Sequence, residues 1–461
     1  MSTDILARIR EPRLRAALPA VAAVAAAAVS AALATVLRLE IAAAGFLGAV
    51  VIGLVRMNPL WTVLALGATR ATLEVFGDKT IARPLGIGLS PPDVISIAFL
   101  CGAGWWLLGQ ARSGNRFWQS ATVGPALFLF AIAAASLSYS PSAAQGARDL
   151  LKWGSGLCAY LVLLAAPVEP RRLRLLVSVV IGGAVVPIAL GFWQLANSIG
   201  EANQFHGGLR IYSTFQHPNT YGFYLVIVLV AVWGMRSWVS GGKRRLLDAV
   251  GLAAFISMLL TLSRTAWGAF ALVVLVVGWR NRRVLAAAAV AGAAFMVVVP
   301  RITFRVLDLF QPRTGSGAGN SLLSRLSNWT NQLAAFGQQP ILGHGWGYTL
   351  TSQGQAAHND YLRMMVETGI VGGAAIVALM WSLIRHSWEA ARGRDDLPRA
   401  FFGLTLAYAL QSLASNNLGK GVYQFYFWLF AGISYVWSET VPYRQDRSRR
   451  PALAATAGNP S

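Results

Sequence analysis

Long apolar segments separated by short basic connections constrain this chain more than any other feature of its sequence. Runs of about 15 to 24 apolar residues recur along the chain, and each can cross a hydrocarbon core of about 30 Å as a helix. The chain has 461 residues, of which 55% are hydrophobic and only 12% are charged. Soluble domains carry about 25% charged residues. The sequence therefore predicts an all-α, polytopic transmembrane helix bundle of about 12 to 14 helices.

The predicted organisation is one membrane domain over residues 1–442, followed by a disordered cytoplasmic tail over residues 443–461. Residues 300–359 form one large extracytoplasmic loop with short helices, and the amphipathic residues 321–336 lie along the membrane surface. The apolar segments centre near these positions: Ala27, Ala49, Leu66, Phe99, Phe130, Leu157, Ala184, Val228, Phe255, Leu272, Ala291, Val371, Leu406 and Phe430.

The basic connections predict the orientation of the bundle. With the N-terminus in the cytoplasm, every strongly basic connection falls inside, including residues 112–116, 171–174, 243–245 and 280–283. Both termini are then cytoplasmic. The net charge of +21 reflects topology and anionic lipid headgroups, and no nucleic-acid signature accompanies it. The N-terminal arginines fit a cleaved signal peptide or a retained first helix, and we favour the retained helix because no clear cleavage site follows.

Polar residues that could bind a ligand or take part in catalysis lie on the opposite side, which is predicted to be extracytoplasmic. Arg210 and Arg264 lie there against the inside bias for basic residues. Guanidinium groups bind phosphate with two parallel hydrogen bonds, and a histidine beside them can titrate near neutral pH. The pattern predicts a diphosphate-binding site with a general base. Four of the five histidines share this side: His206, His217, His344 and His358.

Each of these residues also has a purely structural explanation. Arg264 could extend its side chain to lipid headgroups, and Arg210 could be a simple loop residue. His358 could bond backbone at a helix start, where Asn359 either caps the helix or orients the imidazole.

Charged residues of the following helix also have purely structural explanations. Arg363 and Glu367 are spaced i to i+4, so they can neutralise each other on one helix. Asp360 and Glu367 share the face that points into the bundle.

The sequence predicts no metal and no cofactor. It has no HExxH motif and no paired cysteines, and Cys101 and Cys158 lie inside apolar segments as packed side chains. It also has no nucleotide-binding P-loop. Any group transfer on the outer side must therefore use an already activated donor.

Several short motifs occur in a fixed order between residues 210 and 372. In this order the chain resembles the O-antigen ligase and polymerase superfamily, which comprises bacterial integral-membrane glycosyltransferases and includes exopolysaccharide polymerases. The motifs are Arg210 with Thr214-Phe215 and His217-Pro218-Asn219; Leu262-Ser263-Arg264; Arg325-Leu326-Ser327-Asn328-Trp329; Pro340-Ile341-Leu342-Gly343-His344-Gly345-Trp346-Gly347; and His358-Asn359-Asp360-Tyr361-Leu362 leading to Glu367-Thr368-Gly369.

The resemblance implies polysaccharide biosynthesis at the cell envelope. The donor is a glycan on undecaprenyl diphosphate at the outer face of the bacterial cytoplasmic (inner) membrane, and the acceptor is a glycan, lipid or glycolipid. Arg210 and Arg264 would hold the diphosphate, and His358 would activate the acceptor hydroxyl in a metal-independent, inverting transfer. The supporting residues would be Asn359, Asp360, Glu367, His217, Asn219 and Arg325.

A transporter or flippase of lipid-linked saccharides is the competing hypothesis, because it could use the same arginines without chemistry. Such a protein should show inverted repeats and discontinuous helices at mid-membrane, and the sequence shows neither clearly. The choice between ligase and polymerase stays open, since both share the donor chemistry.

Overall fold

The computed structural model describes residues 51–53, 55, 58–81, 88–202, 209–279, 282–298, 321–351, 358–393 and 395–455. This part of the chain is mostly helical, as predicted. Its strands form one two-stranded antiparallel pair, β1 (Glu201–Ala202) and β2 (Leu209–Arg210). The predicted segments near Ala27 and Ala49, as well as His206 and residues 299–320 and 352–357 of the predicted loop, lie outside the described residues.

Every apolar segment predicted from Leu66 onward contains helix. The helices are α4 (Pro59–Leu73), α5 (Pro91–Arg112), α6 (Val123–Ser136), α7 (Ala143–Ala165), α8 (Pro170–Gly183), α9 (Val185–Ala196), α10 (Pro218–Arg236), α11 (Gly241–Leu260), α12 (Arg264–Gly278), α13 (Arg282–Val298), α15 (Ser321–Gln338), α16 (Tyr348–Thr351), α17 (Asp360–Ala391), α18 (Asp396–Gln411) and α19 (Gly421–Ala455). Proline occupies the first turn of α4, α5, α8 and α10, where its missing N–H costs no intrahelical bond.

Four helical segments of the described chain are long and apolar enough to cross a membrane: Pro91–Arg112, Pro170–Ala196, Pro218–Arg236 and Asp360–Ala391. Two shorter apolar helices, Val123–Tyr139 and Arg264–Gly278, accompany them. These segments indicate a membrane protein. The total number of crossings and their direction stay predictions.

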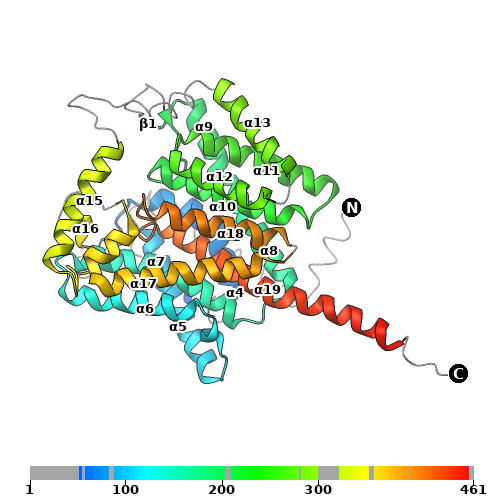
Figure 1. Ribbon diagram of the computed structural model, residues 1–461, viewed down its shortest axis with the longest axis horizontal. Helices are drawn as coiled ribbons and strands as arrows, with labels where there is room; N and C mark the ends of the chain where they lie inside the picture. The colour runs from blue at the N-terminus through cyan, green and yellow to red at the C-terminus, as the bar shows by residue number, and fades with distance from the viewer. Residues whose placement is uncertain are drawn as a thin grey trace.

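The bundle is built around α7, α10 and α19. α19 packs along α7, while α10 contacts α11, α12 and α18, and α17 lies against both α6 and α18 (Figure 1). α10 is buried nearly all round, which is typical of an interior helix. α15 and α16 lie at the end of the bundle away from the C-terminal end of α19 (Figure 1).

The glycine-rich segment 340–347 packs against a kink in α17, which lies at Gly369. Gly369 has φ +71°, and a Cβ there would overlap the carbonyl oxygen of Ile341. Backbone hydrogen bonds join the two segments: the N–H of Gly345 donates to Glu367 (2.8 Å), and the N–H of Ile370 donates to Pro340 (2.9 Å). Glycine is needed at the kink for its conformation and for this close approach.

Two expectations for polar segments have different outcomes. Residues 321–336, predicted as an amphipathic helix, lie within the α15 helix. The structure extends α19 as helix to Ala455, which differs from the disordered tail expected from residue 443. The arginines and alanines of this tail are good helix formers, so helix is compatible with its polar composition.

Candidate functional site

Arg210 is held by three separate segments of the chain. The pairing of β1 with β2 places Glu201 opposite Arg210, and its Oε1 lies 3.3 Å from the Arg210 Nη1. The guanidinium also donates from Nε to the carbonyl of Thr261 (2.9 Å) and from Nη2 to the Oδ1 of Asn219 (2.7 Å). These bonds use three of the five N–H donors of the guanidinium. The other two have no partner among the described residues.

The tight turn between α11 and α12 brings Arg264 next to Arg210. Leu262 in this turn has φ +50°, and the Ser263 Oγ accepts from the N–H of Ala266 to cap α12. Arg264, the first residue of α12, is half-buried. Burial lowers the pKa of Arg210, Glu201 raises it, and the charge of Arg264 lowers it again, which shows that the two arginines are close.

His217 is the N-cap of α10. Its Nδ1 accepts from the N–H of Asn219 at 3.0 Å, so the proton of the neutral ring lies on Nε2, 3.8 Å from the Oε2 of Glu201. Burial lowers its pKa, and the charges of Arg210 and Lys420 lower it further, against the effect of Glu201. The capping bond occupies the lone pair that a general base would need.

His358 is exposed and has a left-handed backbone with φ +51°. It precedes Asn359, whose Oδ1 accepts from the N–H of Leu362 (3.1 Å) as the N-cap of α17, so the asparagine side chain caps the helix. The imidazole forms no hydrogen bond to any described residue. Desolvation, then Arg325 and then Lys420 lower the pKa of His358.

Electrostatic effects link residues from distant parts of the sequence. The charge of Arg264 lowers the pKa of Arg325 on α15, after the effect of burial, and the charge of Arg325 lowers that of His358 in turn. His358 similarly affects His217. We call the following residues the outer site: Arg210, His217, Asn219, Arg264, Arg325 and His358.

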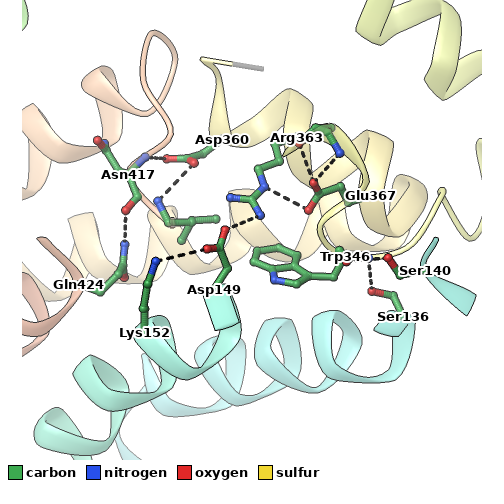
Figure 2. A network of polar contacts seen from close by, with 12 residues as sticks. Ser136, Ser140, Asp149, Lys152, Trp346, Asp360, Arg363, Glu367, Asn417 and Gln424 are labelled. Carbon is green, nitrogen blue, oxygen red and sulfur yellow. Dashed lines mark hydrogen bonds and ion pairs between the residues drawn. The ribbon is translucent and has the colours of Figure 1, made fainter. Parts of the chain in front are cut away.

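Two predicted supporting residues lie instead in a buried network at the head of α17 (Figure 2). Glu367 Oε2 lies 3.1 Å from the Nε of Arg363, which confirms the expected i to i+4 pair. The Nη2 of Arg363 pairs with Asp149 of α7 at 3.1 Å. The other oxygen of Glu367 accepts from the N–H and the hydroxyl of Thr349.

Asp360 fastens the connection between α18 and α19. Its carboxylate accepts from the N–H groups of Asn417 (2.8 Å) and Leu418 (3.3 Å), and its own N–H donates to the carbonyl of Ser412 (2.7 Å). The same connection carries Lys420. Asp360 therefore fixes the backbone of the loop that carries Lys420.

The sequence-based reasoning missed Glu201 and Lys420. Lys420 lies in a connection predicted to be extracytoplasmic, so it runs against the inside bias as Arg210 and Arg264 do, and this signal was available. Glu201 had no such signal, because its position depends on the pairing of two-residue strands.

The outer site combines three guanidinium groups with an imidazole that is neutral near pH 7. Such a site can bind a phosphate-containing anion and accept a proton from a hydroxyl group. In the described part of the chain, no group of three His, Cys, Asp or Glu residues is arranged to hold a metal ion.

Comparison with known families agrees with this geometry. A family model described as O-antigen ligase matches residues 249–377, which run from α11 into α17 and include Arg264, Arg325 and His358. No curated protein matches the chain. The matched segment, residues 249–377, is thus similar to the O-antigen ligase family.

Proposed function

We propose that this protein is an integral-membrane glycosyltransferase of the ligase or polymerase type. It transfers glycan from an undecaprenyl-diphosphate donor to an acceptor hydroxyl at the outer face of the bacterial cytoplasmic membrane. One observation carries the proposal: the imidazole of His358 bonds none of the described residues and lies within electrostatic reach of Arg325, which is itself within reach of Arg264. The family match to residues 249–377 supports the reaction class.

The arginines would bind the leaving group. Negative charge builds on the diphosphate as its bond to the sugar breaks, and guanidinium groups already in place stabilise that charge better than mobile water does. Arg210 is suited to this role because it is only 7% exposed and its bonds to Thr261 and Asn219 fix its plane. Its two remaining N–H groups would donate hydrogen bonds to phosphate oxygens.

His358 would act as the general base. The acceptor hydroxyl gives its proton to the imidazole as its oxygen bonds to the anomeric carbon. The bond from this carbon to the diphosphate oxygen breaks, and its electron pair leaves with undecaprenyl diphosphate. Attack opposite the leaving group inverts the anomeric centre. His217 is the weaker candidate, because its Nδ1 already accepts the capping hydrogen bond.

A reconstituted transfer assay tests the proposal. Purified protein in proteoliposomes receives a lipid-linked donor and an acceptor, and glycan product is measured. His358→Asn should abolish transfer while the fold persists, because asparagine tolerates the left-handed conformation at φ +51°. His386→Asn is the matched control, since His386 lies near the far end of α17, stacked on Tyr435.

The outcomes separate the two candidate functions. Loss of product in His358→Asn with a normal His386→Asn supports the glycosyltransferase. Wild-type turnover in His358→Asn removes the proposed base. Movement of intact lipid-linked donor across the bilayer, with no glycan product, would identify a transporter instead.

A further inference from the structure

A polar cavity of about 220 Å³ lies beside the outer site, and the proposed mechanism does not use it. Residues at the end of α4, the start of α5, the first turns of α7 and the start of α19 form its walls. Seven of the lining residues are charged: Arg70, Glu74, Asp78, Asp93, Arg148, Lys152 and Lys420.

Two of the carboxylates are already neutralised by partners within the protein. Glu74 forms an ion pair with Arg70. The Oδ2 of Asp93 accepts from the Nε of Arg148 (2.7 Å) and from both the N–H and the hydroxyl of Ser90. These carboxylates therefore have little capacity left for a cationic ligand.

The basic side chains, in contrast, keep unused donors. Arg70 is only 3% exposed, yet its Nε has no hydrogen-bond partner in the described part of the chain. Lys152 comes no closer than 3.8 Å to Asp149, and Lys420 has no ion pair or side-chain hydrogen bond with a described residue. Buried donors without partners are costly, so a bound acceptor group would stabilise this arrangement.

Glycines form one wall of the cavity and allow the backbone to approach these groups. A Cβ at Gly421 would lie 2.9 Å from the Nη2 of Arg70 and 3.1 Å from the Cβ of Lys152. A Cβ at Gly419 would lie 3.2 Å from a carboxylate oxygen of Asp149. Larger residues would push the wall away from the cations, so the glycines keep Lys420 beside Arg70 and Lys152.

The cavity lies close to the outer site. Gln216 and Thr220, which lie on either side of the capping residue His217 in sequence, line it. Lys420 also lines it, and the charge of Lys420 lowers the pKa of both His217 and His358. A group bound in the cavity would therefore lie near His217.

The charge of the lining indicates the kind of ligand. Four cationic side chains face three acidic ones, Glu74, Asp78 and Asp93, which leaves an excess of one positive charge. This excess suits a monoanionic carboxylate better than a dianionic phosphate. The amides of Gln145 and Gln216 and the hydroxyl of Thr220 can bond sugar hydroxyl groups.

We propose that this cavity is a subsite for a carboxylate-bearing sugar, a hexuronate, of the acceptor glycan. That the bound sugar belongs to an acceptor rests on the proposed glycosyltransferase function. The binding of a hexuronate in this cavity does not depend on that function. The carboxylate contacts Lys152 and Lys420, and the ring hydroxyls contact the amide side chains.

Binding can be measured without any transfer reaction. Full-length protein in detergent micelles is unfolded by heat with sodium D-glucuronate, D-glucose or inorganic phosphate at equal ionic strength. Glucuronate should raise the midpoint temperature and the two other probes should not. Lys152→Met and Lys420→Met should each weaken glucuronate binding by roughly tenfold. Lys79→Met is the matched control, because Lys79 is exposed outside the cavity with its Nζ 6.0 Å from the Phe76 ring.

Several results would overturn the subsite. They are no shift with glucuronate, an equal shift with glucose or phosphate, or an unchanged shift in both cavity variants. A transfer assay adds a second reading: Lys152→Met should raise KM for an acceptor that ends in glucuronate, leave kcat unchanged, and spare a neutral acceptor. Glucuronate binding without glycan transfer would refute the proposed function alone, and transfer without glucuronate binding would refute the subsite alone.

Discussion

The guanidinium carbon of Arg363 lies 4.4 Å from the centre of the Trp346 ring, and both side chains are fully buried. Trp346 belongs to the glycine-rich segment 340–347, and Arg363 to the first turn of α17. Arg363 also pairs with Glu367 of its own helix and with Asp149 of α7. One side chain thus joins three parts of the molecule (Figure 2).

Arg363→Met should lower the free energy of unfolding by about 3 to 5 kcal/mol, because it leaves two buried carboxylates without their counter-charge. Thermal or denaturant unfolding in micelles measures this loss. Arg385→Met is the control on the same helix, since Arg385 pairs with Glu389 at the same i to i+4 spacing but is 70% exposed. Its effect should stay within about 0.5 kcal/mol. Similar losses for both variants would contradict a special role for the buried pair.

Gly369→Ala should destabilise the protein by at least about 2 kcal/mol, because alanine disfavours φ +71° and its Cβ would overlap the carbonyl of Ile341. Gly104→Ala serves as the comparison, since Gly104 lies inside α5 with open space around its Cα. That change should leave stability unaltered or raise it by up to about 1 kcal/mol. Equal stability of the two variants would show that the kink does not need its glycine.

Arg210→Ala should reduce use of the lipid-linked donor strongly, and Arg210→Lys should recover only part of it. Lysine keeps the charge but cannot contact Thr261, Asn219 and a phosphate together from one planar group. Initial rates at several donor concentrations report the change in kcat/KM. Wild-type donor use by Arg210→Lys would show that charge alone suffices, and wild-type use by Arg210→Ala would remove the arginine from the diphosphate site.

The pH dependence of transfer should reflect the lowered pKa of His358. A general base acts when neutral, so kcat/KM should fall on acidification with a midpoint below 6.5, the usual histidine value. Lys420→Met removes a positive charge that lowers this pKa, so the midpoint should move to higher pH. Lys79→Met should leave it in place. A midpoint above 6.5 in the unmodified protein, or a downward shift in Lys420→Met, would exclude His358 as the titrating base.

Local patterns in the sequence predicted local structure well. Apolar runs located the described helices because burial against lipid or protein requires unbroken apolar length. The i to i+4 spacing of Arg363 and Glu367 predicted their pair, and the position of Asn359 allowed its capping role, because both depend on one helix only.

Long-range partners could not be read from the chain in the same way. Nothing near Asp360 in sequence indicates that it binds the backbone of Asn417 and Leu418, and nothing near Arg210 indicates Thr261 as its acceptor. Such contacts depend on how helices pack and where connections fold back. The sidedness of charges was the one long-range signal in the sequence, and it led to the prediction that Arg210 and Arg264 are neighbours.

The docking of residues 340–347 on the kink of α17 also determines where this chain can be recombined with a relative. The two segments share backbone hydrogen bonds between residues 340–345 and 366–370. A crossover placed between residues 348 and 365 would combine a loop from one parent with a kink from the other. Chimeras that change acceptor choice should therefore inherit residues 321–377 from a single parent, with crossovers outside this unit.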